Sequence, residues 1–488
     1  MERPVAIRVV PRVCRECFCV QSHKTLQRRF LHSRPFTIYR QEGAGVFYAR
    51  FFPGPQAGQI GRIHVRWDQS RLLVENWTIC LGGFLLSDLF REVENCVTAP
   101  RGFRAGATAS GIKSDGDIKD LAVLVSDVPC VAAGTFTTSK TYAAPVKVCK
   151  TRLAHGQAQA IIVNSGNANC ATGEVGLTNA YLMTEYTARQ FGLAQELVLC
   201  SSTGIIGRQL PIEKVAAGVR AIELSTEGGD AFSEAIITTD THAKRLALEF
   251  TLEGRTVRLG GATKGAGMIY PNMATMLCYL TTDAAVEHAW MQREVKAAVD
   301  DSFNMISMDG DMSTNDTCIL FANGLAGNAP INDQHPEAGT FRAALRRVTQ
   351  YLAIEMARDG EGATRLMTVE VQGAKDKADA IKDARGITLS PLWQCALAGG
   401  DPNWGRISSA LGASGCELDQ DSYDIFLGDV QVMKAGLAAD YSQVAAKAVM
   451  QEHEVTVRID LHLGAGQATA WGCDLTHGYI DENTLYTR

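Results

Sequence analysis

One stretch of the chain, KGAGMIYPNMATMLCYLTTD at 264–283, joins a tight loop to an apolar run and so limits how the chain can fold. Its glycines permit strained backbone geometry, and Pro271 fixes one φ angle. The apolar run 276–280 is typical of a buried β-strand. The pattern therefore places Thr275 at the start of a strand, where a threonine on its own is most often only a β-former.

A hydroxyl group in a strained turn can also react. The Thr275 hydroxyl can attack the carbonyl carbon of Ala274 and convert the amide between the two residues into an ester, which water cleaves. The new N-terminal threonine carries nucleophile and base together, because a free α-amine titrates at roughly 7.7–8.0 and can accept the hydroxyl proton near neutral pH. We therefore predict a self-cleaving enzyme with Thr275 as its catalytic nucleophile.

The motif KGAGMIYPNMATML at 264–277 resembles the processing site of the ornithine acetyltransferase (glutamate N-acetyltransferase) family. Members of this family cleave themselves before the threonine and use it to carry an acetyl group. The resemblance starts near Val97, runs to the C-terminus and includes DPNWGR at 401–406. It implies an α/β fold of layered sheets covered by helices, and two fragments, α and β, that assemble into a heterotetramer.

The turn after a predicted strand at 198–200 is the candidate oxyanion hole. Such turns commonly only reverse the chain, but a glycine lets backbone N–H groups approach a developing alkoxide, and a threonine hydroxyl adds a donor. The resemblance assigns this role to Thr203 and Gly204.

The resemblance implies four further substrate-binding residues. They are Thr238, Lys264, Glu361 and Asn483. Lys264 could hold a substrate carboxylate and lower the pKa of the new α-amine by repulsion, and Glu361, between glycines, would attract the amino group of ornithine. Thr239 competes with its neighbour for the first role, and helix capping is the structural alternative for that segment. The terminal Arg488 departs from the serine or threonine of the family.

These residues predict transfer of acetyl from N-acetylornithine to glutamate through an acetylated Thr275, with ping-pong kinetics. Acetyl-CoA remains open as a second donor. The reaction needs neither a metal nor a cofactor. Two alternatives are an N-terminal-nucleophile amidohydrolase or aminopeptidase, and a metabolite-binding protein without catalysis.

Periodicity along the chain indicates an α/β or α+β fold. Strands are expected at 121–127, 160–163, 198–200, 318–321, 366–371, 424–434, 455–464 and 467–474. Helices are expected at 177–192, 287–303, 340–357 and 440–452, with another opening at 401–407. The segment 308–317 is expected to be a hydrogen-bonded turn rather than a calcium loop, because it lacks the final glutamate of an EF-hand.

Residues 1–96 lie outside the resemblance, and 97–274 and 275–488 are the expected α and β parts. The first 40 residues are rich in arginine, which fits an organelle transit peptide, a dispensable extension or a start codon placed too early. Cys14, Cys17 and Cys19 form a weak zinc signal because no second pair is spaced for it. The apolar segment 79–86 is too short to span a bilayer.

Composition excludes several classes of protein. A formal charge of −6 without a long basic run argues against nucleic acid as a partner. The 14 cysteines are spread widely, and Cys130, Cys200, Cys278 and Cys318 sit in apolar runs, which indicates a reducing compartment. We expect a cytoplasmic location, or a mitochondrial or plastid matrix if the N-terminus is a transit peptide, and no membrane partner.

Overall fold

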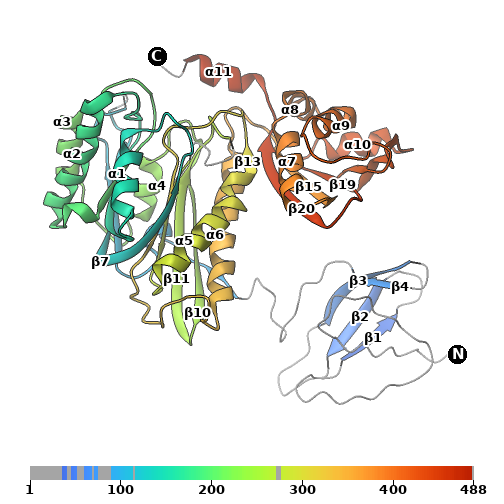
Figure 1. The fold of residues 1–488 in the computed structure, drawn as a ribbon, viewed down its shortest axis with the longest axis horizontal. Coiled ribbons are helices and arrows are strands. Elements are labelled where there is room, and N and C mark those ends of the chain that lie inside the picture. The colour runs from blue at the N-terminus through green and yellow to red at the C-terminus, as the bar shows by residue number, and fades with distance from the viewer. Residues whose placement is uncertain are drawn as a thin grey trace. The chain divides into compact units, whose positions relative to one another are not determined.

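The computed structural model describes residues 89–113, 116–270 and 276–485, and the backbone of four earlier strands. The chain divides into two compact units, Met1–Leu89 and Phe90–Arg488. In the first unit an antiparallel sheet has the order β1-β2-β3-β4 (Figure 1). Its strands are β1 (Phe36–Arg40), β2 (Val46–Phe51), β3 (Ile60–Asp68) and β4 (Arg71–Val74). The amino-terminal cysteine cluster and the apolar segment 79–86 lie outside the described residues.

The second unit contains a nine-stranded sheet with the order β5-β10-β11-β12-β14-β7-β8-β9, in which β6 also pairs with β7. The pairs β12–β14 and β8–β9 are parallel, and the others are antiparallel. The strands are β5 (Arg91–Glu92), β6 (Phe103–Thr108), β7 (Leu121–Phe136), β8 (Gln157–Asn164), β9 (Val198–Ser202), β10 (Lys244–Leu252), β11 (Arg255–Lys264), β12 (Leu277–Thr282) and β14 (Thr317–Ala322).

Both faces of this sheet are covered. On β12, Leu277 and Tyr279 join one apolar cluster, and Cys278 and Leu280 join another. Helices α5 and α6 pack beside β7, β10 and β11, while α1, α2 and α3 pack at the β8–β9 end and α4 packs on β6 and β7 (Figure 1). The helices are α1 (Ala144–Leu153), α2 (Gly173–Phe191), α3 (Ile212–Ala221), α4 (Gly229–Ala235), α5 (His288–Asp300) and α6 (Ala338–Arg358). Burial of both faces explains why the run 276–280 shows no polar alternation.

A second, seven-stranded sheet has the order β13-β20-β15-β19-β16-β17-β18. Its strands are β13 (Ile306–Ser307), β15 (Leu366–Ala374), β16 (Asp424–Leu427), β17 (Val430–Lys434), β18 (Leu437–Ala438), β19 (Glu454–Asp460) and β20 (Gly466–Cys473). Helix α7 packs on β15 and β20, and α6 contacts both sheets. The remaining helices are α7 (Lys377–Thr388), α8 (Pro391–Ala398), α9 (Trp404–Gly412), α10 (Gln443–Val449) and α11 (His477–Leu485).

The mixed α/β class with layered sheets is confirmed, and most expected elements are present. Three local expectations are wrong. Lys264 ends β11 instead of lying in a glycine-rich loop, the strand expected at 424–434 is the hairpin of β16 and β17, and the helix expected at 440–452 is the shorter α10. The four cysteines in apolar runs are buried, and the ten cysteines of the described residues are free thiols. In the part that the structure describes, no helix is both long and apolar enough to cross a bilayer.

Candidate active site

The ammonium group of Lys264, at the end of β11, meets two threonine hydroxyls. Lys264 Nζ donates to Thr238 Oγ1 at 2.6 Å and to Thr203 Oγ1 at 3.2 Å. Thr238 belongs to the loop after α4, and Thr203 to the turn after β9. Three of the predicted site residues, from segments far apart in sequence, therefore meet at one buried cation.

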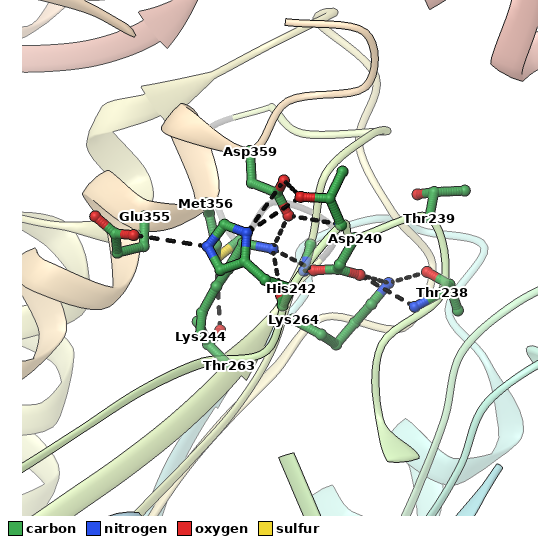
Figure 2. A network of polar contacts seen from close by, with 12 residues as sticks. Thr238, Thr239, Asp240, His242, Lys244, Thr263, Lys264, Glu355, Met356 and Asp359 are labelled. Atoms are coloured by element: carbon green, nitrogen blue, oxygen red, sulfur yellow. Dashed lines mark hydrogen bonds and ion pairs between the residues drawn. The ribbon is translucent and has the colours of Figure 1, made fainter. Parts of the chain in front are cut away.

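Asp240 is the anion that balances this lysine (Figure 2). One of its oxygens, Oδ2, accepts from the Thr238 amide at 3.1 Å and lies 4.0 Å from Lys264 Nζ. The other, Oδ1, accepts from the Gly265 amide and from Lys244 Nζ, both at 2.6 Å. Burial raises the pKa of this carboxyl, but the positive charges of the two lysines outweigh that effect and lower the pKa to about 2. Asp240 is therefore ionised at physiological pH, and no helix begins here, so it caps none.

A second cluster surrounds Glu361, in the glycine-flanked turn after α6. Its Oε1 accepts from Thr239 Oγ1 and its Oε2 from Asn483 Nδ2, each at 2.7 Å. The Glu361 amide donates to Ala266 O at 2.9 Å. Gly267 faces the carboxylate, where an added Cβ would lie 2.3 Å from Glu361 Cδ. The glycine thus lets this anion approach the loop at 265–270.

The two clusters are joined through adjacent threonines. Thr238 binds Lys264, and Thr239 binds Glu361, so both threonines belong to the site. Burial lowers the pKa of Lys264, whereas the charges of Asp240 and Glu361 raise it. A cation and an anion thus occupy one site, as a ligand with both a carboxylate and an amino group requires.

The candidate oxyanion turn packs against the loop that follows β8. The Thr203 amide donates to Asn164 O at 3.0 Å. Gly204 has a φ of +130°, and an added Cβ would lie 2.4 Å from Gly166 C. Asn315 Nδ2 secures both loops, because it donates to Ala168 O and to Ser202 O. A residue with a side chain cannot replace Gly204 without moving one of these loops.

Two aspartates of the 308–317 turn anchor the segment around the predicted cleavage point. Asp309 accepts from the amides of Met268 and Ile269 at 2.6 and 2.9 Å. Asp316 Oδ1 accepts from the amide of Met276 at 3.0 Å. The expected hydrogen-bonded turn is confirmed.

The predicted cleavage point itself lies between these two anchors. Ala274 and Thr275 belong to 271–275, outside the described residues. The amide that Asp316 binds is the one that follows Thr275 in the sequence. Burial raises the pKa of the Asp316 carboxyl well above its usual range, which favours its neutral form there.

Sequence reasoning missed several residues of the site. No role was assigned to Lys244, Asp309, Asp316 and Asp359. Lys244 binds Asp240, Asp359 binds Lys244, and the other two aspartates bind the processing segment. The one available signal was a lysine at the head of the apolar, alternating segment 244–252. A charge in such a segment is costly unless it is paired, which indicates a buried partner.

The ArgJ family model matches residues 104–488 of this chain. The chain belongs to the ArgJ family. It is 48% identical over 393 residues to the arginine biosynthesis bifunctional protein ArgJ of Symbiobacterium thermophilum, covering 80% of this chain and 98% of that protein. The Dehalococcoides mccartyi protein of the same name is 45% identical over 395 residues, with 81% and 98% covered.

Solved ArgJ structures are also similar to the chain. The arginine biosynthesis bifunctional protein argJ of Bacillus halodurans is 41% identical, with a TM-score of 0.42, and covers 43% of this chain and 98% of its own. The ornithine acetyltransferase of Mycobacterium tuberculosis, complexed with ornithine, is 34% identical with a TM-score of 0.35, covering 38% and 100%.

Membership of the ArgJ family confirms the resemblance that the processing motif and DPNWGR indicated. The chain is an acyltransferase of arginine biosynthesis, and its relatives are named as bifunctional. Neither the hydrolase nor the metabolite-binding alternative is supported by the family.

Proposed function

We propose that the chain cleaves itself between Ala274 and Thr275 and then transfers acetyl from N-acetylornithine to glutamate through an acetylated Thr275. The new α-amine accepts the proton of the threonine hydroxyl, and the oxygen attacks the acetyl carbonyl. Ornithine leaves with that proton on its α-amine. Glutamate then attacks the ester, and the nucleophile is regenerated.

The oxyanion hole of this reaction is Thr203 with Gly204. The observation that carries the proposal is the contact of Lys264 with both Thr203 and Thr238. A cation held there keeps the Thr203 hydroxyl group fixed and stabilises negative charge that develops beside it. Charge stabilisation of this kind accelerates acyl transfer because the donors need no reorganisation during the reaction.

The substrate-binding residues in this proposal are Thr238, Lys264, Glu361 and Asn483. Lys264 binds the α-carboxylate that ornithine and glutamate share. Glu361, oriented by Thr239 and Asn483, binds the side-chain ammonium of ornithine. One pocket therefore serves both amino acids in turn, which predicts ping-pong kinetics.

The proposal includes the two fragments, their assembly and their location in the cell. The α fragment ends at Ala274, the β fragment starts at Thr275, and the two assemble as a heterotetramer in the cytoplasm. An organelle matrix is the alternative for a chain with an arginine-rich leader. Acetyl transfer assayed from N-acetylornithine and from acetyl-CoA in parallel determines whether the second donor is used.

Replacement of the nucleophile tests the proposal. Thr275→Ala should remain one full-length band on a denaturing gel and transfer no acetyl, because it has no hydroxyl. Thr275→Ser is the matched control and should still cleave, with serine as the first residue of the β fragment. Two fragments of normal size from the alanine variant would refute the assignment.

A further inference from the structure

A buried charge network continues from Asp240 on the side away from Thr238 (Figure 2). The side chain of Lys244, the first residue of β10, is 0% exposed. Its Nζ donates to Asp240 Oδ1 at 2.6 Å and to Asp359 Oδ2 at 2.5 Å. Removing these charges from water costs several kcal/mol for each ion, so packing alone does not explain them.

Asp240 divides its two oxygens between two lysines. Oδ1 binds Lys244, whereas Oδ2 lies 4.0 Å from Lys264, beyond hydrogen-bond distance. Lys264 therefore directs its N–H groups to Thr203 and Thr238. The position of the catalytic lysine thus depends on how strongly Asp240 is bound from its other side.

We propose that Lys244 is a positioning residue for acyl transfer: it binds Asp240 through one oxygen and thereby keeps that carboxylate from drawing Lys264 away from Thr203 and Thr238. The inference rests on the proposed function, in which Lys264 binds substrate and supports the oxyanion turn. Asp359 supports Lys244 from the opposite side and accepts from the Thr241 amide at 3.0 Å.

The charges around Lys264 determine the direction in which its pKa changes when the charge of Lys244 is removed. Lys264 faces the anions Asp240 and Glu361, the buried carboxyl group of Asp316, and the cations Lys244 and Lys113. Burial lowers the pKa of Lys264, Asp240 raises it and Lys244 lowers it again. Removal of the Lys244 charge therefore raises the pKa of Lys264 and leaves Lys264 as the nearest cation to Asp240.

The test is Lys244→Met, which keeps a similar length and removes the charge. We expect kcat to fall about tenfold or more, because Lys264 moves towards Asp240 and loses the threonines. The basic limb of kcat/KM, where Lys264 loses its proton, should shift to higher pH. Cleavage of each variant is scored on a denaturing gel beforehand, and only cleaved enzyme is assayed.

A double variant distinguishes a positioning role of Lys244 from a role in stability alone. Lys244→Met with Asp359→Asn removes one buried charge of each sign, so its Tm should recover towards the wild-type value. Asp240 then still has Lys264 as its nearest cation. The loss in kcat and the shift of the basic limb of kcat/KM should therefore persist. If Lys244→Met alone does not fold, the double variant provides the same comparison.

Two results would overturn the inference: wild-type kcat and basic limb in the folded variants, or recovery of kcat together with Tm in the double variant. Failure of the proposed function has a different signature, because wild-type enzyme would then transfer no acetyl from N-acetylornithine to glutamate.

Discussion

Replacing Gly204 by alanine should disrupt the candidate oxyanion turn through backbone contact. The residue has a φ of +130°, and an added methyl group would lie 2.4 Å from Gly166 C and 2.5 Å from Asn167 N. Both are main-chain atoms, which cannot rotate away as the end of a side chain can. The turn or the loop after β8 must therefore shift, and Thr203 shifts with it.

A second glycine of the same turn supplies the matched control. Gly207 also has a positive φ, +82°, but an added Cβ there meets no atom within 4 Å. Alanine at a positive φ costs about 1–2 kcal/mol. Overpacking adds about 1–3 kcal/mol at Gly204 alone. We therefore expect the free energy of unfolding to fall by about 2–5 kcal/mol for Gly204→Ala and by about 1–2 kcal/mol for Gly207→Ala.

Stability and function are measured in separate backgrounds. Urea unfolding in the Thr275→Ala background follows one uncleaved polypeptide, so its free energy refers to a single chain. Cleavage and acetyl transfer are measured with Thr275 present. Gly204→Ala should be slow in both reactions, whereas Gly207→Ala should resemble wild type. Equal unfolding free energies and equal rates for the two variants would contradict the steric reasoning.

Two further predictions concern charge. Glu361→Gln should lower kcat/KM for N-acetylornithine about 10- to 100-fold, since a hydrogen bond to a charged group contributes about 1.5–3 kcal/mol. N-acetylnorvaline, which lacks the side-chain amine, is the control donor, and its kcat/KM should change little. Asp240→Asn should cost about 2 kcal/mol of unfolding free energy at pH 7. Because the pKa of Asp240 is lowered to about 2, its contribution is present above the unfolded pKa and lost as pH falls. The gap between variant and wild type should therefore narrow from about pH 4 towards pH 2 in urea titrations, and a gap that stays constant would refute the assignment.

The processing motif and the main strands were predictable because their signals are local. An apolar run with both faces buried identified β12, and alternation identified β15. The charge network was not predictable in this way. Lys244 and Asp359 are 115 positions apart and meet only because β10 and α6 pack together.

The sequence alone determined the buried strand β12, and the place of Thr275 in front of that strand stays a prediction. Only the tertiary structure decided that Lys244, Lys264 and Asp240 share one dry interior. The reason is physical: the pKa and the position of a charged group depend on the water that other segments exclude and on the charges that they bring near, and no local sequence pattern records either.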